Sequence, residues 1–341
     1  MEAIHLSEIV LNEFLQGLGA WLRTPFRVIT FLGDEEFFIL LLTALYWCVD
    51  QALGIKVGIM LLLANGTNAF FKFLFRTPRP YWISDGVSPF HMESSFGLPS
   101  GHSQLPASVW GWIAVEVKKR WFTVVALVII FLIGISRIFL GVHFLTDVLL
   151  GWTLGGLLVW AAWALQRKIT DWVVDISTGA KIGVIAGSGA FLVTIIVLVR
   201  LASAGWQLPA AWAARAGDVD PFSLDGTFTF FGTWFGVLSG YVWLAASRGR
   251  FLASNGGWRR IVRFVIGLVG VVVLWMGLGQ LFPRDANVVS YALRFVRYAL
   301  TGLWVAWWAP LMFEKIGLLT FAAGKRNSPG AVGSEDGAPN A

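Results

Sequence analysis

Long apolar stretches separated by short polar segments run along almost the whole chain. Several of these stretches reach the roughly 20 residues that a helix needs to cross a hydrocarbon core of about 30 Å. We expect membrane-spanning helices at about 37–49, 55–75, 103–117, 122–140, 144–165, 182–201, 226–246, 261–282 and 291–313. The pattern therefore predicts an all-α, polytopic membrane helix bundle.

The two ends of the chain differ in pattern from the expected spans. Residues 6–32 interleave apolar and polar positions, which predicts an amphipathic helix at the membrane interface and an N-terminal segment at 1–33. The acidic run 34–36 follows, and acidic residues stabilise the start of a helix. The last segment, 324–341, is polar and rich in Gly and Pro, so we expect it to be disordered.

The composition excludes an ordinary soluble protein. Of the 341 residues, 57% are hydrophobic and only 13% are charged, and the mean hydropathy is +0.70. The net charge of +6 comes from short basic clusters between apolar stretches, which indicates membrane orientation and not nucleic-acid binding. Cys48 is the single cysteine, so a disulfide within the chain and a zinc site built from several thiolates are both excluded.

The basic residues are unevenly divided between the two sides of the predicted bundle. More than half of the 26 Lys and Arg residues fall on one side, which includes the cluster 118–120, and this side should face the cytoplasm. The loop 76–102, the turn 138–143 and the loop 202–225 then face outward, and the segment 324–341 lies inside. We therefore expect an integral cell-membrane protein with its chemistry at the outer face.

Three outward-facing stretches carry most of the unusual polar side chains. They are KFLFRTPRP at 72–80, PSGH at 99–102 and SRIFLGVHFLTD at 136–147. Taken singly, each has a structural explanation: a cation that snorkels to the membrane edge, a serine that caps a helix, or a His–Asp pair one helical turn apart. Together they place two of the four histidines at one membrane face with cations, a serine and an aspartate. This grouping indicates a functional site.

The cations and the Ser-Gly turn suit a tetrahedral oxyanion. Lys72, Arg79 and Arg137 can meet anion oxygens, and Ser100 and Gly101 lie where a helix N-terminus directs its free N–H groups. Phosphate is the obvious ligand. The cations would stabilise the transferring phosphoryl group as magnesium does in kinases, so we expect neither a metal ion nor another cofactor.

The histidines and the aspartate suit nucleophilic attack at phosphorus. Asp147 follows His143 by four positions, so on a helix its carboxylate would orient the imidazole and make it more basic. His143 is therefore a candidate nucleophile. His102 would then act as the general acid that protonates the leaving alkoxide.

The order and spacing of these residues resemble the three-part signature of the type-2 phosphatidic acid phosphatase superfamily. The matching parts are Lys72 and, after six residues, Arg79-Pro80; then Pro99-Ser100-Gly101-His102; then Ser136-Arg137, five residues, His143, three residues and Asp147. This superfamily shares its helical core with vanadium-dependent haloperoxidases. The resemblance covers roughly residues 30–165, and it implies a phosphatase core at 34–166 with additional transmembrane helices at 167–323.

The resemblance also implies a role for each motif residue. His143 attacks phosphorus and becomes a phosphohistidine, Asp147 supports it, and His102 protonates the leaving group. The phosphate oxygens are held, without a metal, by Lys72, Arg79, Ser100, Gly101 and Arg137. The implied reaction is metal-independent hydrolysis of a lipid phosphate or diphosphate at the outer membrane face.

The substrate and the type of reaction stay open at this stage. Undecaprenyl diphosphate and phosphatidic acid are examples of lipids with the required anionic head. A lipid phosphotransferase would use the same site with a hydroxyl acceptor in place of water. A lipid transporter or flippase is a third hypothesis, although the spans after 181 carry few ionisable residues at mid-depth. The expected partner is the membrane lipid phosphate, without nucleic acid, and the oligomeric state stays open.

Residues outside the signature have simpler expected roles. Asn65, Asn68 and Lys72 share one helix face, where they either support the site or join helices. Small residues permit helices to pack closely, and we expect this of the glycine pairs 151 and 155, and 267 and 270.

Two further groups carry charge near the outer face. The loop 76–102 is long enough to be a lid, and we expect its residues His91 and Glu93 to be solvated. Arg294 and Arg297 lie three positions apart and either anchor the chain at the interface or reach a second phosphate or lipid headgroup.

Overall fold

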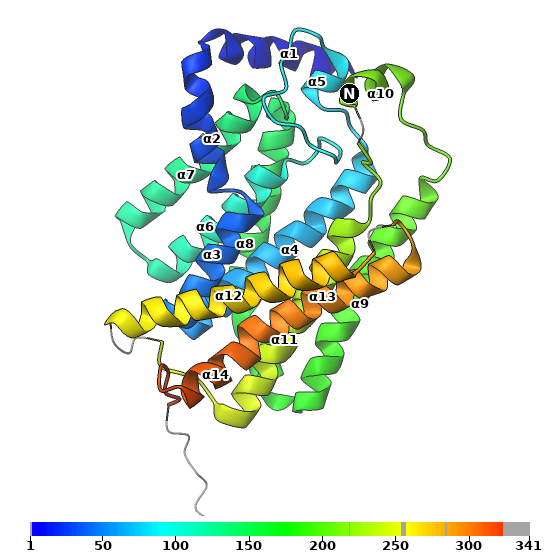
Figure 1. Ribbon diagram of the computed structural model, residues 1–341. Coiled ribbons are helices and arrows are strands. Elements are labelled where there is room, and N and C mark those ends of the chain that lie inside the picture. The colour runs from blue at the N-terminus through cyan, green and yellow to red at the C-terminus, as the bar shows by residue number, and fades with distance from the viewer. Residues whose placement is uncertain (1, 218, 254–256, 284, 323–341) are drawn as a thin grey trace, which may run out of the picture.

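The computed structural model describes residues 2–217, 219–253, 257–283 and 285–322, which form a bundle of helices (Figure 1). In chain order the elements are α1 (Glu2–Gly17), η1 (Ala20–Leu22), α2 (Arg23–Phe31), α3 (Glu35–Ala44), η2 (Leu45–Val49), α4 (Gln51–Phe75), α5 (Pro80–Ile83), α6 (Gly101–Val117), α7 (Arg120–Phe139), α8 (Leu145–Asp175), α9 (Thr178–Ala202), α10 (Ala210–Ala216), α11 (Asp225–Arg248), α12 (Gly257–Leu281), α13 (Val288–Leu303), η3 (Trp304–Trp308) and α14 (Ala309–Lys315). The predicted all-α polytopic bundle is confirmed. The predicted disordered tail, 324–341, lies outside the described residues.

Six helical segments of the described chain are long and apolar enough to cross a membrane, judged by length and composition. They are Gln51–Ile83, Arg120–Phe139, Leu145–Asp175, Thr178–Ala202, Asp225–Arg248 and Gly257–Leu281. The other expected spans are shorter helices. The stretch 37–49 is α3 followed by the π-helical turn η2, 103–117 is the 17-residue helix α6, and 291–313 is divided among α13, the π-helical turn η3 and α14.

The N-terminal segment is not the single amphipathic helix that the sequence pattern predicts. It forms two helices, α1 and α2, separated by a bend at residues 18–22. Gly19 has a φ of 121° at this bend, a conformation that glycine adopts at little cost and other residues rarely adopt. α1 lies across one end of the bundle, while α2 runs down beside α7 (Figure 1).

Close packing of α8 against α6 brings the starts of these two helices together. An added Cβ at Gly151 would lie 2.7 Å from the carbonyl oxygen of Ser100, and one at Gly155 would lie 2.6 Å from the Cβ of Ala107. The two helices therefore need glycine at both positions, as expected from the sequence. The Ser100 N–H also donates to the carbonyl oxygen of Asp147 at 3.0 Å, which links the two helix starts directly.

The helices after residue 178 dock on the side of the bundle formed by α3, η2 and α4. The Trp47 indole N–H donates to the carbonyl oxygen of Val305 at 2.9 Å, and the Tyr46 hydroxyl donates to that of Ala306 at 2.9 Å. Gly267 faces the Trp47 ring and Gly270 faces the Trp304 ring, and in both places an added Cβ would overlap the indole. The expected close packing at this second glycine pair is therefore present.

Candidate active site

The structure brings the motif residues together at the end of the bundle that α1 covers. They lie on separate elements: Lys72 near the end of α4, Arg79 just before α5, Ser100 at the N-cap of α6, Gly101 and His102 in its first turn, Arg137 in the last turn of α7, His143 in the turn before α8, and Asp147 in the first turn of α8. Ser136, also part of the signature, faces its own helix, where its hydroxyl donates to Ile133 O at 2.6 Å. Ser100 makes no side-chain capping bond and accepts a bond from Ser103 Oγ at 3.1 Å.

His143 is buried between a carboxylate and a guanidinium. Its Nδ1 lies 3.1 Å from Asp147 Oδ2, and its Nε2 lies 3.2 Å from Arg79 Nη1. The guanidinium can only donate, so Nε2 must be the acceptor and Nδ1 must carry the proton that goes to Asp147. Asp147 Oδ2 also accepts the Phe144 N–H at 3.0 Å, which fixes the carboxylate. The network therefore selects the tautomer with a lone pair on Nε2.

The surroundings of His143 favour its neutral form. Burial comes first, since the ring is 1% exposed, and the charges of Arg79, Arg137 and Lys72 act in the same direction. Together they lower the pKa of His143 well below its ordinary value of 6.5. The imidazole is thus neutral at pH 7, as a nucleophile at phosphorus must be.

Ser95 joins the two cations that precede the PSGH turn. Its hydroxyl accepts from Lys72 Nζ at 2.7 Å and from Arg79 Nη2 at 3.1 Å. The guanidinium of Arg79 is fully buried and also donates to the carbonyl oxygens of Ser95, Val142 and Phe96 at 2.7, 2.9 and 3.2 Å. These bonds hold Arg79 against the His143 turn. The sequence alone does not point to Ser95, because a serine in a polar loop carries no distinguishing signal.

Glu93 does not have the solvated position expected from the sequence. Its carboxylate forms an ion pair with Arg137, and it lies 3.8 Å from Arg79 Nη2 with its side chain 20% exposed. Burial alone would raise the pKa of Glu93, but the charges of Arg79 and Arg137 outweigh burial and hold the pKa well below its ordinary range. The loop therefore places a carboxylate on the same guanidinium groups that were expected to bind phosphate. His91, by contrast, is 59% exposed, as expected.

His102 has a partner that the sequence did not reveal. Its Nε2 lies 2.7 Å from Asp34 Oδ1, and Asp34 makes no capping bond with its side chain at the start of α3. The acidic run 34–36 lies at the start of α3 as expected, with Asp34 as the N-cap and Glu35 and Glu36 in the first turn. Asp34 also orients the candidate general acid. His102 and Asp34 are 68 positions apart in the sequence, so no local pattern reveals this contact.

Polar side chains of α1 hold the His143 turn from the other side. Asn12 Nδ2 donates to the carbonyl oxygens of Ile138 and His143 at 2.8 and 3.1 Å, and Gln16 Nε2 donates to that of Phe139 at 3.0 Å. One helical turn earlier, Glu8 accepts from the Thr146 N–H and hydroxyl, both at 2.8 Å. Positions 8, 12 and 16 share one helix face, which is the sequence signal that could have identified them.

The polar stripe on α4 supports the PSGH turn and also joins two helices. Asn68 Nδ2 donates to Pro99 O at 3.2 Å and to Gln104 Oε1 at 3.0 Å. Gln104 Nε2 in turn donates to Thr67 Oγ1 at 2.9 Å. An added Cβ at Gly101 would lie 3.4 Å from Asn68 Oδ1, so the turn and the amide are in contact. Asn68 thus supports the site and also joins two helices, which are the two roles expected for this stripe.

The arginines of α13 have partners within the second half of the chain. Arg294 Nη2 forms an ion pair with Asp225 Oδ2 at 2.6 Å, and Arg297 lies 5.1 Å from the centre of the Tyr298 ring. In the described ranges, no three His, Cys, Asp or Glu side chains are grouped closely enough to hold a metal ion.

Comparison with known proteins agrees with the motif. The family model of the PAP2 superfamily matches residues 53–171, and that of the "PAP2 superfamily phosphatase, transmembrane extension" matches residues 228–325. Phosphatidylglycerophosphatase B of Bacillus subtilis (strain 168) is 34% identical over 180 residues, which are 49% of this chain and 84% of that protein. The crystal structure of a PAP2-type phosphatidylglycerolphosphate phosphatase from Bacillus subtilis is 30% identical, covers 50% of this chain and 89% of that one, and has a TM-score of 0.44.

Glucose-6-phosphatases are also similar to the chain. Human glucose-6-phosphatase 3 is 29% identical over 184 residues, which are 47% of this chain and 53% of that protein. Mouse glucose-6-phosphatase 3 is 25% identical over 333 residues, which are 88% of this chain and 92% of that protein. The two family models match the first and second parts of this chain, and the 34% identical Bacillus protein is matched over 84% of its own length. This multi-pass membrane protein therefore belongs to the PAP2 superfamily of transmembrane phosphatases.

Proposed function

We propose that this protein hydrolyses the phosphate or diphosphate ester of a membrane lipid, without a metal ion, through a phosphohistidine at His143. The observation that carries the proposal is the position of the His143 ring. Its protonated Nδ1 faces Asp147, and the lone pair of Nε2 faces the cluster of Arg79, Arg137 and Lys72. A phosphoryl group bound by these cations would meet the nucleophile directly.

The reaction would take place in two steps. His143 Nε2 forms a bond to phosphorus while the phosphorus–oxygen ester bond breaks, and His102, which must be protonated for this step and has Asp34 as its counter-charge, gives its proton to the leaving alkoxide. Neutral His102 then takes a proton from a water molecule, whose oxygen attacks phosphorus and breaks the phosphorus–nitrogen bond. Inorganic phosphate leaves, and both histidines return to their initial protonation states. The cations stabilise the charge on the phosphoryl oxygens in both steps.

Two features favour a lipid as the substrate and an outward-facing site. The site lies at one end of membrane-spanning helices, where the headgroup of a bilayer lipid is found, and the division of basic residues favours the outer face for this end. The Bacillus relative is named for a lipid phosphate, phosphatidylglycerophosphate. We assign the catalytic core to 34–166 and the additional transmembrane helices to 167–323, with the segment 1–33 at the interface.

A sugar phosphate is the second candidate substrate. The mouse glucose-6-phosphatase 3 matches 88% of this chain, which includes the transmembrane extension, whereas the Bacillus lipid phosphatase matches 49%. The extension is therefore shared with relatives named for a water-soluble substrate. A phosphotransferase, in which an alcohol replaces water in the second step, uses the same residues.

Phosphate release from a defined panel tests the proposal. The protein is purified in detergent with EDTA and given lipid phosphates, lipid diphosphates and glucose 6-phosphate, each with and without an added alcohol acceptor. We expect the wild type to prefer a lipid, and His143→Ala to lose activity by about 10⁴-fold or more, because the nucleophile is absent. His91→Ala removes an exposed histidine whose Nε2 lies 3.9 Å from Glu93 Oε1 but which does not face His143, and it should retain most of the activity.

Each alternative has its own result in this panel. A preference for glucose 6-phosphate would overturn the lipid assignment, and phosphate transfer that needs the alcohol would identify a phosphotransferase. Activity that appears only when magnesium is restored would contradict the metal-independent mechanism.

A further inference from the structure

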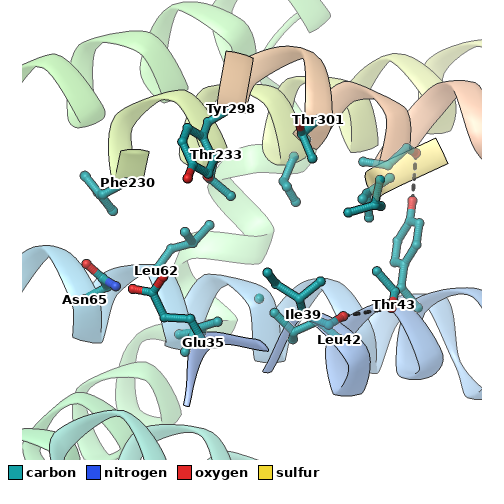
Figure 2. A pocket seen from close by; sticks show the side chains of 18 of the residues that line it. Glu35, Ile39, Leu42, Thr43, Leu62, Asn65, Phe230, Thr233, Tyr298 and Thr301 are labelled. Carbon is teal, nitrogen blue, oxygen red and sulfur yellow. Dashed lines mark hydrogen bonds between the residues drawn. The ribbon is translucent and has the colours of Figure 1, made fainter. Parts of the chain in front are cut away.

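A cavity of about 170 Å³ lies between the catalytic core and the transmembrane extension (Figure 2). On the core side it is lined by residues of α3, α4 and α6, such as Ile39, Leu62 and Leu105. On the extension side it is lined by α11, α12 and α13, with Phe230 and Val271 among the lining residues. Nothing in the proposed chemistry at His143 makes use of this space.

The wall of the cavity presents hydrocarbon over most of its area. Three of the four threonines that line it bond to the backbone of their own helices: Thr43, Thr233 and Thr301 donate to carbonyl oxygens four residues earlier, at 2.7, 2.9 and 2.9 Å. These hydroxyls are satisfied, so the methyl groups remain for contact with an occupant. Glu35 and Asn65 form a polar end, where the carboxyl group points toward the amide (Figure 2).

Gly58 shows that the space is a real gap in the packing. This glycine of α4 is buried, yet apart from the backbone of its own helix and its two chain neighbours an added Cβ would have no atom within 4 Å. Protein interiors are normally packed to the density of organic crystals, and atoms that line a void lose their dispersion contacts. An apolar occupant would restore those contacts, whereas water would find few polar partners there.

The polar end of the cavity lies close to the candidate active site. Leu105 is one turn after His102 on α6, Asn65 is one turn before Asn68 on α4, and Glu35 directly follows Asp34. One turn of helix corresponds to about 5 Å, so the cavity begins about that far from the site. It then follows α3, which extends over about 14 Å.

The cavity can be reached from outside the protein along α3. Glu35 and Ile39 both line it and are both exposed, Ile39 to 37%. In a membrane, the surroundings of such an apolar helix face are lipid chains. An occupant would therefore enter laterally, with its polar head at the end where Glu35, Asn65 and the site lie.

We propose that this cavity binds one hydrocarbon chain of the lipid whose phosphate is held beside His143. The inference rests on the proposed lipid phosphatase function and assigns the transmembrane extension a role in substrate binding. The extension forms one wall of the cavity through Phe230, Thr233 and Tyr298, so a core without it would lack the chain-binding site.

Substitution of Gly58 tests the role of the cavity. Gly58→Phe places a ring in the gap, and Gly58→Leu is a smaller change for the case in which the first variant does not fold. Gly187→Phe is the matched control, because this glycine of α9 is exposed and also has no atom within 4 Å of an added Cβ. The rates to compare are kcat/KM for a long-chain lipid phosphate and for a short, water-soluble phosphate monoester.

We expect Gly58→Phe to lower kcat/KM for the long-chain substrate by about tenfold or more, since losing two buried methylenes already costs that factor. The short substrate should be cleaved as by the wild type, and Gly187→Phe should leave both rates unchanged. Equal losses for both substrates in a folded Gly58→Leu variant, or no loss for either, would overturn the inference.

A binding measurement separates this inference from the proposed function. A lipid phosphate with a photoreactive group near the end of its chain is crosslinked to inactive His143→Ala. We expect labelled peptides from 54–65 and 229–237, and loss of this labelling when Gly58→Phe is added. Labelling elsewhere would overturn the cavity as the chain site even if the protein hydrolyses lipids. Correct labelling without hydrolysis by the wild type would overturn the proposed function and keep the chain site.

Discussion

The candidate active site and the boundary between the core and the transmembrane extension use buried positions in opposite ways. At the site in the core, buried charged groups meet polar partners: the guanidinium of Arg79 contacts three carbonyl oxygens, a hydroxyl and the His143 ring. At the boundary with the extension, Gly58 faces empty space and satisfied threonines present methyl groups. Polar side chains that contact one another define the site in the core. At the boundary, missing side-chain atoms leave the cavity. A motif can describe the first kind of site but not the second.

The largest difference in kcat between changes in the two regions should come from removing one carboxylate charge in each. Asp147→Asn keeps the shape of the side chain but no longer fixes the His143 tautomer or stabilises the positive imidazole, so kcat should fall by about 10³- to 10⁴-fold. Asp225→Asn is the matched change in the extension, where the carboxylate pairs with Arg294 near the surface. It should change kcat by less than about twofold, because this ion pair lies outside the site, and it should lower folding stability by only about 0–1 kcal/mol. A comparable loss of phosphate release in Asp147→Asn and Asp225→Asn would show that the two regions do not differ in this way.

A smaller loss of kcat is expected when Asp34, the partner of the candidate general acid His102, is changed. Asp34→Asn removes the charge that orients His102, and kcat should fall by about 10²-fold, the lower range of general-acid contributions. Substrates with good leaving groups need little protonation, so a nitrophenyl phosphate should be affected much less than an alkyl phosphate. Equal losses with both leaving groups would show that Asp34 acts through structure alone.

The pH dependence of His143 tests the electrostatic side of the comparison. Because the pKa of His143 is lowered by burial and by the three cations, the neutral nucleophile persists as the pH falls below 6.5 and is lost only at lower pH. The same shift means that stability associated with this group is present above pH 6.5 and decreases as the pH falls through the folded pKa. NMR of ¹⁵N-labelled histidine can follow it, since the chain has four histidines and His143→Ala identifies the signal. A midpoint above 6.5 would contradict the network described here.

The smallest expected effect concerns the carboxylate that occupies the cation cluster. Glu93→Gln should strengthen inhibition by inorganic phosphate and orthovanadate by roughly tenfold, because the anion no longer competes with a charged side chain for Arg137. Glu116→Gln is the matched control, as Glu116 pairs with Lys56 away from the site. The measurement is the inhibition constant of each anion for the wild type and the two variants. Weaker inhibition in Glu93→Gln would mean that Glu93 positions Arg137 and does not compete with the anion.

The sequence predicts the site better than its surroundings, for a physical reason. The motif residues follow fixed spacings because each lies at a helix end, and the structure brings them together. The sequence does not predict the His102 partner of Asp34 or the buried position of Glu93, because a helix start and a solvated loop explain these residues locally, while their partners lie 68 and 44 residues away. The bend at Gly19 was also missed, because the apolar pattern continues through it.

The cavity could not be predicted from hydrophobic periodicity. Its lining residues follow the same apolar pattern as any packed helix, and the gap arises only from how α3 and α4 meet α11 and α13. Gly58 is one glycine among 38, and its sequence context does not separate it from glycines that permit close packing, such as Gly151. Voids depend on the relative placement of whole helices, which local sequence does not encode.

Under the proposed function, the ion pair of Glu93 with Arg137 would make phosphate binding at this site an exchange of anions. The resting cluster already holds one negative charge, so an incoming ligand gains only the difference between its charge and that of the carboxylate. A phosphate monoester carries about −1.5 to −2 at pH 7 and gains by the exchange. A phosphodiester carries a single negative charge, the same as the carboxylate, so it gains nothing from the exchange. Glu93 would thus reject the abundant diester headgroups of the bilayer by charge count alone, before any contact with the rest of the lipid.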